Sequence, residues 1–221
     1  NSNVKNVKLA STVRSLGRAF DSSSVENVVL NEGLEKINKR AFKATANLKS
    51  VDIPTTVKVI EEGAFQQSGL TELVIPAGVT KIGSRAFKSC SELESISLPE
   101  GITKVAYGTF FECTGIESIT LPSTVTSIEH IAFRDCRSLR SIVVPEGVTS
   151  IGSDAFICCK RLEEITIPNS VTKMGDQVFF GCDELKSITL GSGLTSVGDN
   201  VFGSCGKLKK IIVPAGTAAH F

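Results

Sequence analysis

Six cysteines recur at a constant interval and are the most reactive side chains in the sequence. They lie 23 residues apart, and Cys158 is the only other cysteine; the six are Cys90, Cys113, Cys136, Cys159, Cys182 and Cys205. Neighbours in such a column could form disulfides if their backbones were about 4.8 Å apart. Side chains in one column point the same way, however, and the pattern of a small disulfide-rich domain is absent. We interpret the column as small buried apolar residues, because Ser23, Thr45 and Ser68 occupy the same place earlier in the chain.

Neither the cysteines nor the histidines are arranged to bind a metal ion. Zinc requires four ligands that converge in a tetrahedron, whereas a ladder spreads its sulfur atoms along a line. The two histidines, His130 and His220, are separated by about four of these intervals and cannot share a metal. We expect His130 to be a solvated loop residue, and we predict neither a metal nor a cofactor.

A glycine cluster near the end of the chain resembles a phosphate-binding loop. It comprises Gly191, Gly193 and Gly198. Glycines equivalent to Gly193 and Gly198 recur in earlier intervals, whereas Gly191 replaces the proline of its unit; the helix that a phosphate loop requires is also missing. No nucleophile, base and orienting group recur together either, so we expect no catalysis. An enzyme would need a pocket in an atypical stretch such as 105–111.

A repeat positions all these residues. Nine phenylalanines recur at steps of 22 or 23 residues: Phe20, Phe42, Phe65, Phe87, Phe110, Phe133, Phe156, Phe179 and Phe202. Around each of them the sequence approximates L-x-x-I-x-L-P-x-G-V-T-x-I-G-x-x-A-F-x-x-C. A fixed period of this length is the mark of stacked repeats. Because a single unit cannot bury its own apolar residues, stacking must join them into continuous columns.

Each unit predicts two short extended segments and a compact turn, as residues 139–161 illustrate. Ile142 and Val144 alternate with an outward residue and predict a strand that ends at Pro145. Residues 148–151 predict a second extended piece. The segment around Phe156 is too short for an α-helix, so we expect one tight or 3₁₀ turn there.

Composition excludes several classes of function. The 24 basic and 23 acidic side chains give a formal net charge of +1, which indicates neither nucleic acid nor a membrane surface as a partner. No apolar run is long enough to span a membrane. We expect a single domain over residues 1–221, with about nine repeats and a partial tenth, in a fragment of a longer chain. Residues 217–221 depart from the repeat, and we interpret them as the approach to a C-terminal cap.

The strand segment L-x-x-I-x-L-P with the following V-T-x-I-G-x-x-A-F-x-x-C resembles the BspA-like bacterial leucine-rich repeats of twenty-three residues. The resemblance covers nearly the whole chain. It implies a repeat solenoid, a right-handed superhelix with a parallel β-sheet on one face and short 3₁₀ or irregular turns on the other. It also implies a cell-surface or secreted protein that binds host or bacterial proteins, with a cytoplasmic location as the alternative. Local departures, such as Ala106 and Glu129 in place of glycine and Thr109 in place of alanine, do not change this fold.

Two columns of the repeat are free to contact a partner. The first is the outward position of the sheet strand: Val74, Ser97, Thr120, Val143, Thr166 and Thr189. With the serine-rich column beside it, this position predicts a flat surface with few charges that suits an extended protein contact. The alternative is that β-branched residues simply favour strands.

The second free column follows each repeated phenylalanine. It is mostly polar but contains Phe111, Ile157 and Phe180. If these three were exposed together, the apolar patch would mark an interface. The alternative is that they fold onto the neighbouring turn.

We therefore expect a non-catalytic protein-binding module, an adhesin-like surface protein. The alternative is a structural spacer or scaffold domain without a ligand of its own, since a fold alone does not establish function.

Overall fold

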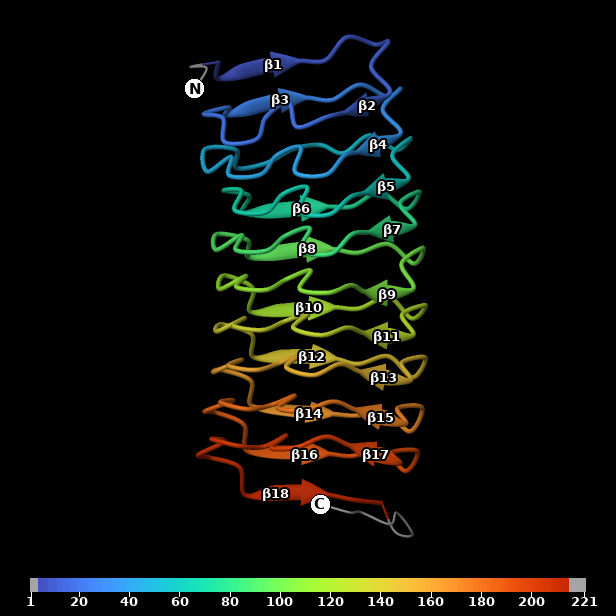
Figure 1. The fold of residues 1–221 in the computed structure, drawn as a ribbon, viewed down its shortest axis with the longest axis vertical. Coiled ribbons are helices and arrows are strands. Elements are labelled where there is room, and N and C mark those ends of the chain that lie inside the picture. Colours follow the sequence, from blue (N-terminus) through green and yellow to red (C-terminus); the bar gives the residue numbers. More distant parts are fainter. Residues whose placement is uncertain (1–3, 215–221) are drawn as a thin grey trace.

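The computed structural model describes residues 4–214, which wind into a stack of short parallel strands along one long axis (Figure 1). Two strands recur in almost every turn. The first set comprises β1 (Asn6–Lys8), β3 (Asn27–Val29), β6 (Glu72–Val74), β8 (Ser95–Ser97), β10 (Ser118–Thr120), β12 (Ser141–Val143), β14 (Glu164–Thr166), β16 (Ser187–Thr189) and β18 (Lys210–Ile212). The second set comprises β2 (Ser15–Leu16), β4 (Lys36–Ile37), β5 (Val59–Ile60), β7 (Lys81–Ile82), β9 (Lys104–Val105), β11 (Ser127–Ile128), β13 (Ser150–Ile151), β15 (Lys173–Met174) and β17 (Ser196–Val197).

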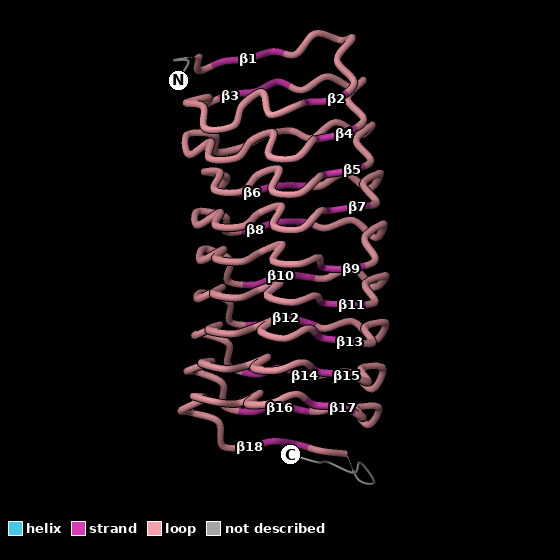
Figure 2. The backbone as a smooth tube through the Cα atoms, viewed as in Figure 1, coloured by secondary structure: helices cyan, strands magenta, loops and turns pink. Residues whose placement is uncertain are grey.

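Most of each turn is loop, and residues 4–214 contain no helix (Figure 2). It follows that no helix in this part of the chain could cross a membrane. The parallel-sheet solenoid expected from the repeat is confirmed. Every strand pairing is parallel, and Ile119 of β10 faces Ile142 of β12 one unit later. The first ladder is interrupted between β3 and β6, where residues 50–52 form no strand, and within the described residues β8 does not pair with β10, nor β12 with β14.

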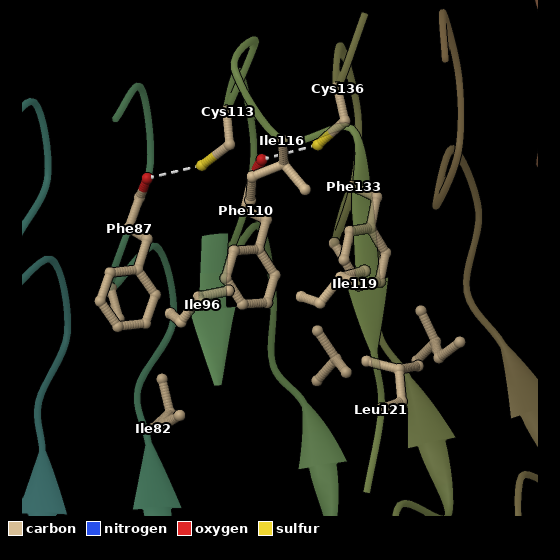
Figure 3. Packing of buried hydrophobic residues seen from close by; sticks show 14 of the residues in the cluster. Ile82, Phe87, Ile96, Phe110, Cys113, Ile116, Ile119, Leu121, Phe133 and Cys136 are labelled. Carbon is tan, nitrogen blue, oxygen red and sulfur yellow. Dashed lines mark hydrogen bonds between the residues drawn. The ribbon is translucent and has the colours of Figure 1, made fainter. Parts of the chain in front are cut away.

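The core consists of columns of similar apolar residues, as the period predicts. Successive anchor phenylalanine rings stack with centroids 5.1–6.1 Å apart and planes within 14° of parallel. Figure 3 shows three of them in a row, Phe87, Phe110 and Phe133. The anchors from Phe42 to Phe179 are at most 1% exposed. Each ring therefore contacts one partner above and one below, and these contacts join every turn to its neighbours.

The anchor segment is a run of tight turns, and no 3₁₀ helix is found in the described residues. In one unit, Asp154 and Cys158 adopt left-handed φ angles of 57° and 58°, which bend the chain twice within five residues. Alternate amides donate to the next turn instead of within their own; the Phe156 amide donates to the Val178 carbonyl at 2.9 Å. A helix would need these amides for itself, so stacking takes precedence over helix formation.

The last strand in the described part of the chain is β18, in which Ile211 and Ile212 are 41% and 38% exposed. The C-terminal cap expected at residues 217–221 lies outside the described residues.

Candidate protein-binding surface

The first strand ladder exposes a regular face, because its three-residue strands from β3 to β16 each bury only their middle side chain. In β12 the central Ile142 is 6% exposed, whereas Val143 is 73% exposed. Val74 is equally free at 72%. Of the other predicted face residues, Ser97, Thr120 and Thr166 are exposed and Thr189 is half-buried. We call this surface, with the serine-rich column beside it, the sheet face.

The serine-rich column lies at the first residue of each of these strands. Glu72, Ser95, Ser118, Ser141 and Glu164 are exposed in it, and Ser187 is half-buried. Between the two columns the face is hollowed in two places. A shallow hollow of about 550 Å³ lies over β12, β14 and β16, and another of about 380 Å³ lies over β8 and β10. The centre of the sheet face therefore carries mostly small, uncharged side chains and is slightly concave.

Charged side chains lie at the rim of the sheet face, one residue before every strand of the first set except β6. There Arg140 pairs with Glu117 at 3.9 Å, and Lys186 pairs with Glu163 of the turn before it. The Lys186 hydrogen bond lowers the pKa of the Glu163 carboxyl. Exposed pairs of this kind contribute little to stability. An uncharged centre with a charged rim is the usual anatomy of a protein interface.

Phe111, Ile157 and Phe180 do not form one exposed apolar patch. Ile157 is buried at 7% exposure, and Phe111 and Phe180 are half-buried. Arg134 occupies the turn between Phe111 and Ile157. Phe180 lies over Gly203 of the next turn, where an added Cβ would be only 2.6 Å from the ring. The side chains of this column fold against their neighbours because the adjacent turn is only about 5 Å away.

The cysteine column is structural. All seven cysteines are free thiols. Each thiol of the column donates to the anchor carbonyl of the preceding turn, for example Cys113 to Phe87 at 3.0 Å and Cys136 to Phe110 at 3.1 Å (Figure 3). Burial raises the pKa of the Cys90 thiol to about 11 and that of Cys113 well above its ordinary value. Within residues 4–214 no group of side chains could bind a metal ion.

This arrangement predicts which thiols react. Cys158 and Cys205 are half-buried, whereas the other five are fully buried and protonated at neutral pH. Because the thiolate is the nucleophile, a chromogenic disulfide reagent at neutral pH should modify at most these two in the native protein, and slowly. All seven should react at once in denaturant. Rapid modification of Cys113 or Cys136 in the native protein, read by peptide mass, would contradict the buried ladder.

The histidine and the glycines considered as candidate sites in the sequence also have structural explanations. His130 is a largely exposed loop side chain whose Nδ1 lies 2.6 Å from the Ser153 carbonyl oxygen. His220 lies outside the described residues. A Cβ added at Gly193 would lie 2.0 Å from the Asn169 carbonyl oxygen, and one at Gly198 would lie 2.4 Å from the Gly175 backbone. These glycines allow adjacent turns to approach closely, which explains them without a phosphate.

Comparison with known proteins agrees with the geometry. The sequence profile of the BspA type leucine rich repeat region matches in six copies, over residues 1–117 and 103–219. No curated protein matches the sequence. A leucine-rich repeat protein from Bacteroides ovatus is 34% identical, with a TM-score of 0.89, over 95% of this chain and 55% of its own. This chain therefore spans little more than half of that relative.

Two further bacterial structures share the fold at lower identity. A leucine rich cell surface protein from Faecalibacterium prausnitzii is 25% identical, with a TM-score of 0.59, over 97% of this chain and 61% of its own. The T. pallidum leucine rich repeat protein is 26% identical, with a TM-score of 0.61, over 94% of this chain and 79% of its own. The repeat profile, the stacked anchors and these relatives together place the chain in the BspA-type leucine-rich repeat family.

Proposed function

We propose that the chain is a non-catalytic protein-binding module and that its sheet face contacts the partner. The observation that carries this proposal is the exposure of Val74 and Val143, at 72% and 73%, on a face whose interior side is fully packed. Most exposed positions around them are serine or threonine, which lose little side-chain entropy when they are covered. An extended protein surface could therefore cover the face with a small free-energy penalty, because few charged groups would lose their hydration.

The setting that we propose is a cell surface, with a protein of a host or of another bacterium as the partner. One structural relative is named as a cell surface protein, and the repeat family as a whole is built for contact rather than chemistry. From this likeness to a cell surface protein we extend the proposal to an adhesin-like role. It rests on the face described above and not on the fold alone.

A charge placed at the centre of the sheet face should abolish binding, because a partner would have to bury it unpaired. The intact chain is immobilised and exposed to surface-protein fractions of bacterial and host cells. The double variant Val143→Arg and Thr166→Arg should lose the retained protein, with a drop in affinity of about a hundredfold. The matched control is Thr149→Arg and Thr172→Arg, two exposed threonines beside the second ladder, which should bind as the unmodified chain does.

Two results would reject the proposal. Equal retention by both double variants would place binding elsewhere. If neither the unmodified chain nor the control variant retains a specific protein, the result would favour a spacer, whose contribution is length alone.

A further inference from the structure

Three consecutive turns place aromatic rings against cations on the turn side of the solenoid. Phe111 lies between Lys88 of the turn before and Arg134 of the turn after. The Lys88 Nζ lies 4.4 Å from the ring centroid, and the Arg134 Cζ lies 5.7 Å from it. These three residues occupy the same place in their units, directly after the anchor phenylalanine.

A second ring is positioned in the same way four residues earlier in the same turn. The Arg85 guanidinium carbon lies 4.7 Å from the Tyr107 ring centroid, and its Nη2 donates to the Tyr107 hydroxyl at 3.2 Å. On the other side, the His130 ring centroid is 5.5 Å away. We call these six residues the aromatic–cation cluster: Arg85, Lys88, Tyr107, Phe111, His130 and Arg134.

The geometry of the cluster determines which surface it presents. A cation over an aromatic ring uses the electron-rich face of that ring. With the faces occupied by neighbouring turns, each ring offers solvent its edge, which carries the positive part of the quadrupole. The cations themselves remain accessible, since all six side chains are half-buried or exposed. Ring edges and cations together form a surface that favours anions.

The carboxylates near the cluster neutralise it only in part. Glu62 interacts electrostatically with Arg85, but it accepts its hydrogen bond from Lys39, at 2.8 Å. Asp135 lies 3.5 Å from Arg134 Nε and 3.0 Å from Arg137 Nη2, so one carboxylate serves two guanidinium groups. Arg134 Nε is buried and has no hydrogen-bond partner. Glu112 accepts a hydrogen bond from Ser89 at 2.6 Å, and no ion pair is found for Arg85 or Lys88 within residues 4–214. The cluster therefore has cations left for a partner.

We propose that the aromatic–cation cluster is a second docking surface, distinct from the sheet face, for an acidic segment of a protein. The chemistry that it recognises is a pair of carboxylates placed against ring edges and cations. A uniform polyphosphate fits less well, because Glu112, Asp135 and Asp154 are interspersed with the cations and the formal net charge of the chain is only +1. Asp and Glu side chains can avoid these acids by their spacing, whereas an evenly charged backbone cannot.

The test uses the intact chain and short fluorescent synthetic peptides of equal length, one of glutamate and glycine and one of lysine and glycine. The glutamate peptide should bind, and binding should weaken as salt is raised. Phe111→Ala and the double variant Lys88→Gln and Arg134→Gln should each weaken binding about tenfold or more. Phe111→Tyr should preserve it.

Matched controls separate this surface from others. Phe180→Ala removes a half-buried ring from the same column, without the cations, and should not change binding. Val143→Arg should not change peptide binding either. The proposal for the aromatic–cation cluster and the proposal for the sheet face can therefore fail independently of each other. The proposal is overturned if the lysine peptide binds equally well, if the Phe111 and Lys88–Arg134 variants bind as the unmodified chain does, or if inorganic polyphosphate binds more tightly than the glutamate peptide.

Discussion

Raising the pH above about 9 is expected to unfold this protein steeply, because its buried thiols must stay protonated. Cys90, Cys113, Cys136, Cys159 and Cys182 are all fully buried. Burial is the largest cause of their raised pKa; it moves the pKa of Cys90 from 9.0 to about 11 and also raises the pKa of each of the other four. In the unfolded chain the same thiols ionise near their ordinary pKa.

The sign of the effect follows from proton binding. Below about pH 9 both states keep the thiol protons, so the contribution of these groups to stability is fully present. Above that pH the unfolded chain loses protons that the folded chain retains, and each thiol lowers the free energy of unfolding by about 1.4 kcal/mol per pH unit. Five such thiols give a slope of about 7 kcal/mol per unit. Since domains are stable by only about 5–15 kcal/mol, unfolding should be complete within one or two units.

The measurement is urea unfolding, followed by circular dichroism under reductant, from about pH 7 to about pH 10.5. The double variant Cys113→Ser and Cys136→Ser should lose about two fifths of the alkaline slope. Serine suits this column, because Ser68 already occupies it and contacts Cys90 at 3.3 Å. Cys158→Ser, outside the column and only partly buried, should keep most of the slope. A slope that is the same in all three proteins would contradict the role given to the buried thiols.

Removing one ring from the middle of the phenylalanine ladder should cost about 3–5 kcal/mol. Phe133 is 0% exposed, and its ring lies 5.3 Å from both Phe110 and Phe156. In the Phe133→Ala variant both contacts are lost and a cavity is left between two turns. Because stability in a stack is a sum of nearest-neighbour terms, a defect at the centre also weakens the coupling of the two halves.

The matched control is Phe202→Ala near the end of the stack. Phe202 is half-buried, and within residues 4–214 its ring stacks on Phe179 alone, at 6.1 Å. Its loss should cost about half as much, and mainly at that end. Urea unfolding gives the total loss, and amide hydrogen exchange locates it: Phe133→Ala should speed exchange of the Phe110 and Phe156 amides, whereas Phe202→Ala should not. Equal losses for the two variants would contradict a ladder of pairwise contacts.

The period alone predicted the stacked turns, the two extended pieces and the buried cysteine column. Those features depend only on which positions repeat, so they could be predicted without coordinates. A tight turn at each anchor was also expected, but its left-handed residues were not, because residues such as Asp154 and Gln67 give no glycine signal in the sequence. Their conformation is imposed by amides that bond to the next turn, a constraint that exists only in the assembled stack.

The surface was predictable in part. Strand alternation correctly placed Val143 outward, because its period is local. The burial of Ile157 and the aromatic–cation cluster depend on side chains from three successive turns, which no single unit contains. One signal was available: Tyr107 and Phe111 replace polar residues in a unit that also departs from the repeat at Ala106 and Thr109. Departures that gather in one unit indicate where to look for a site.

Site-specific photocrosslinking tests most directly whether the exposed sheet face binds a partner. A photoreactive amino acid is placed at position 143 on that face in one protein and at position 149 beside the second ladder in another, and both are irradiated with the surface-protein fractions. Both positions are exposed, so accessibility is matched. The sheet-face proposal predicts one discrete adduct from position 143 and none from position 149. An adduct from position 149 alone, or the same adducts from both positions, would contradict it.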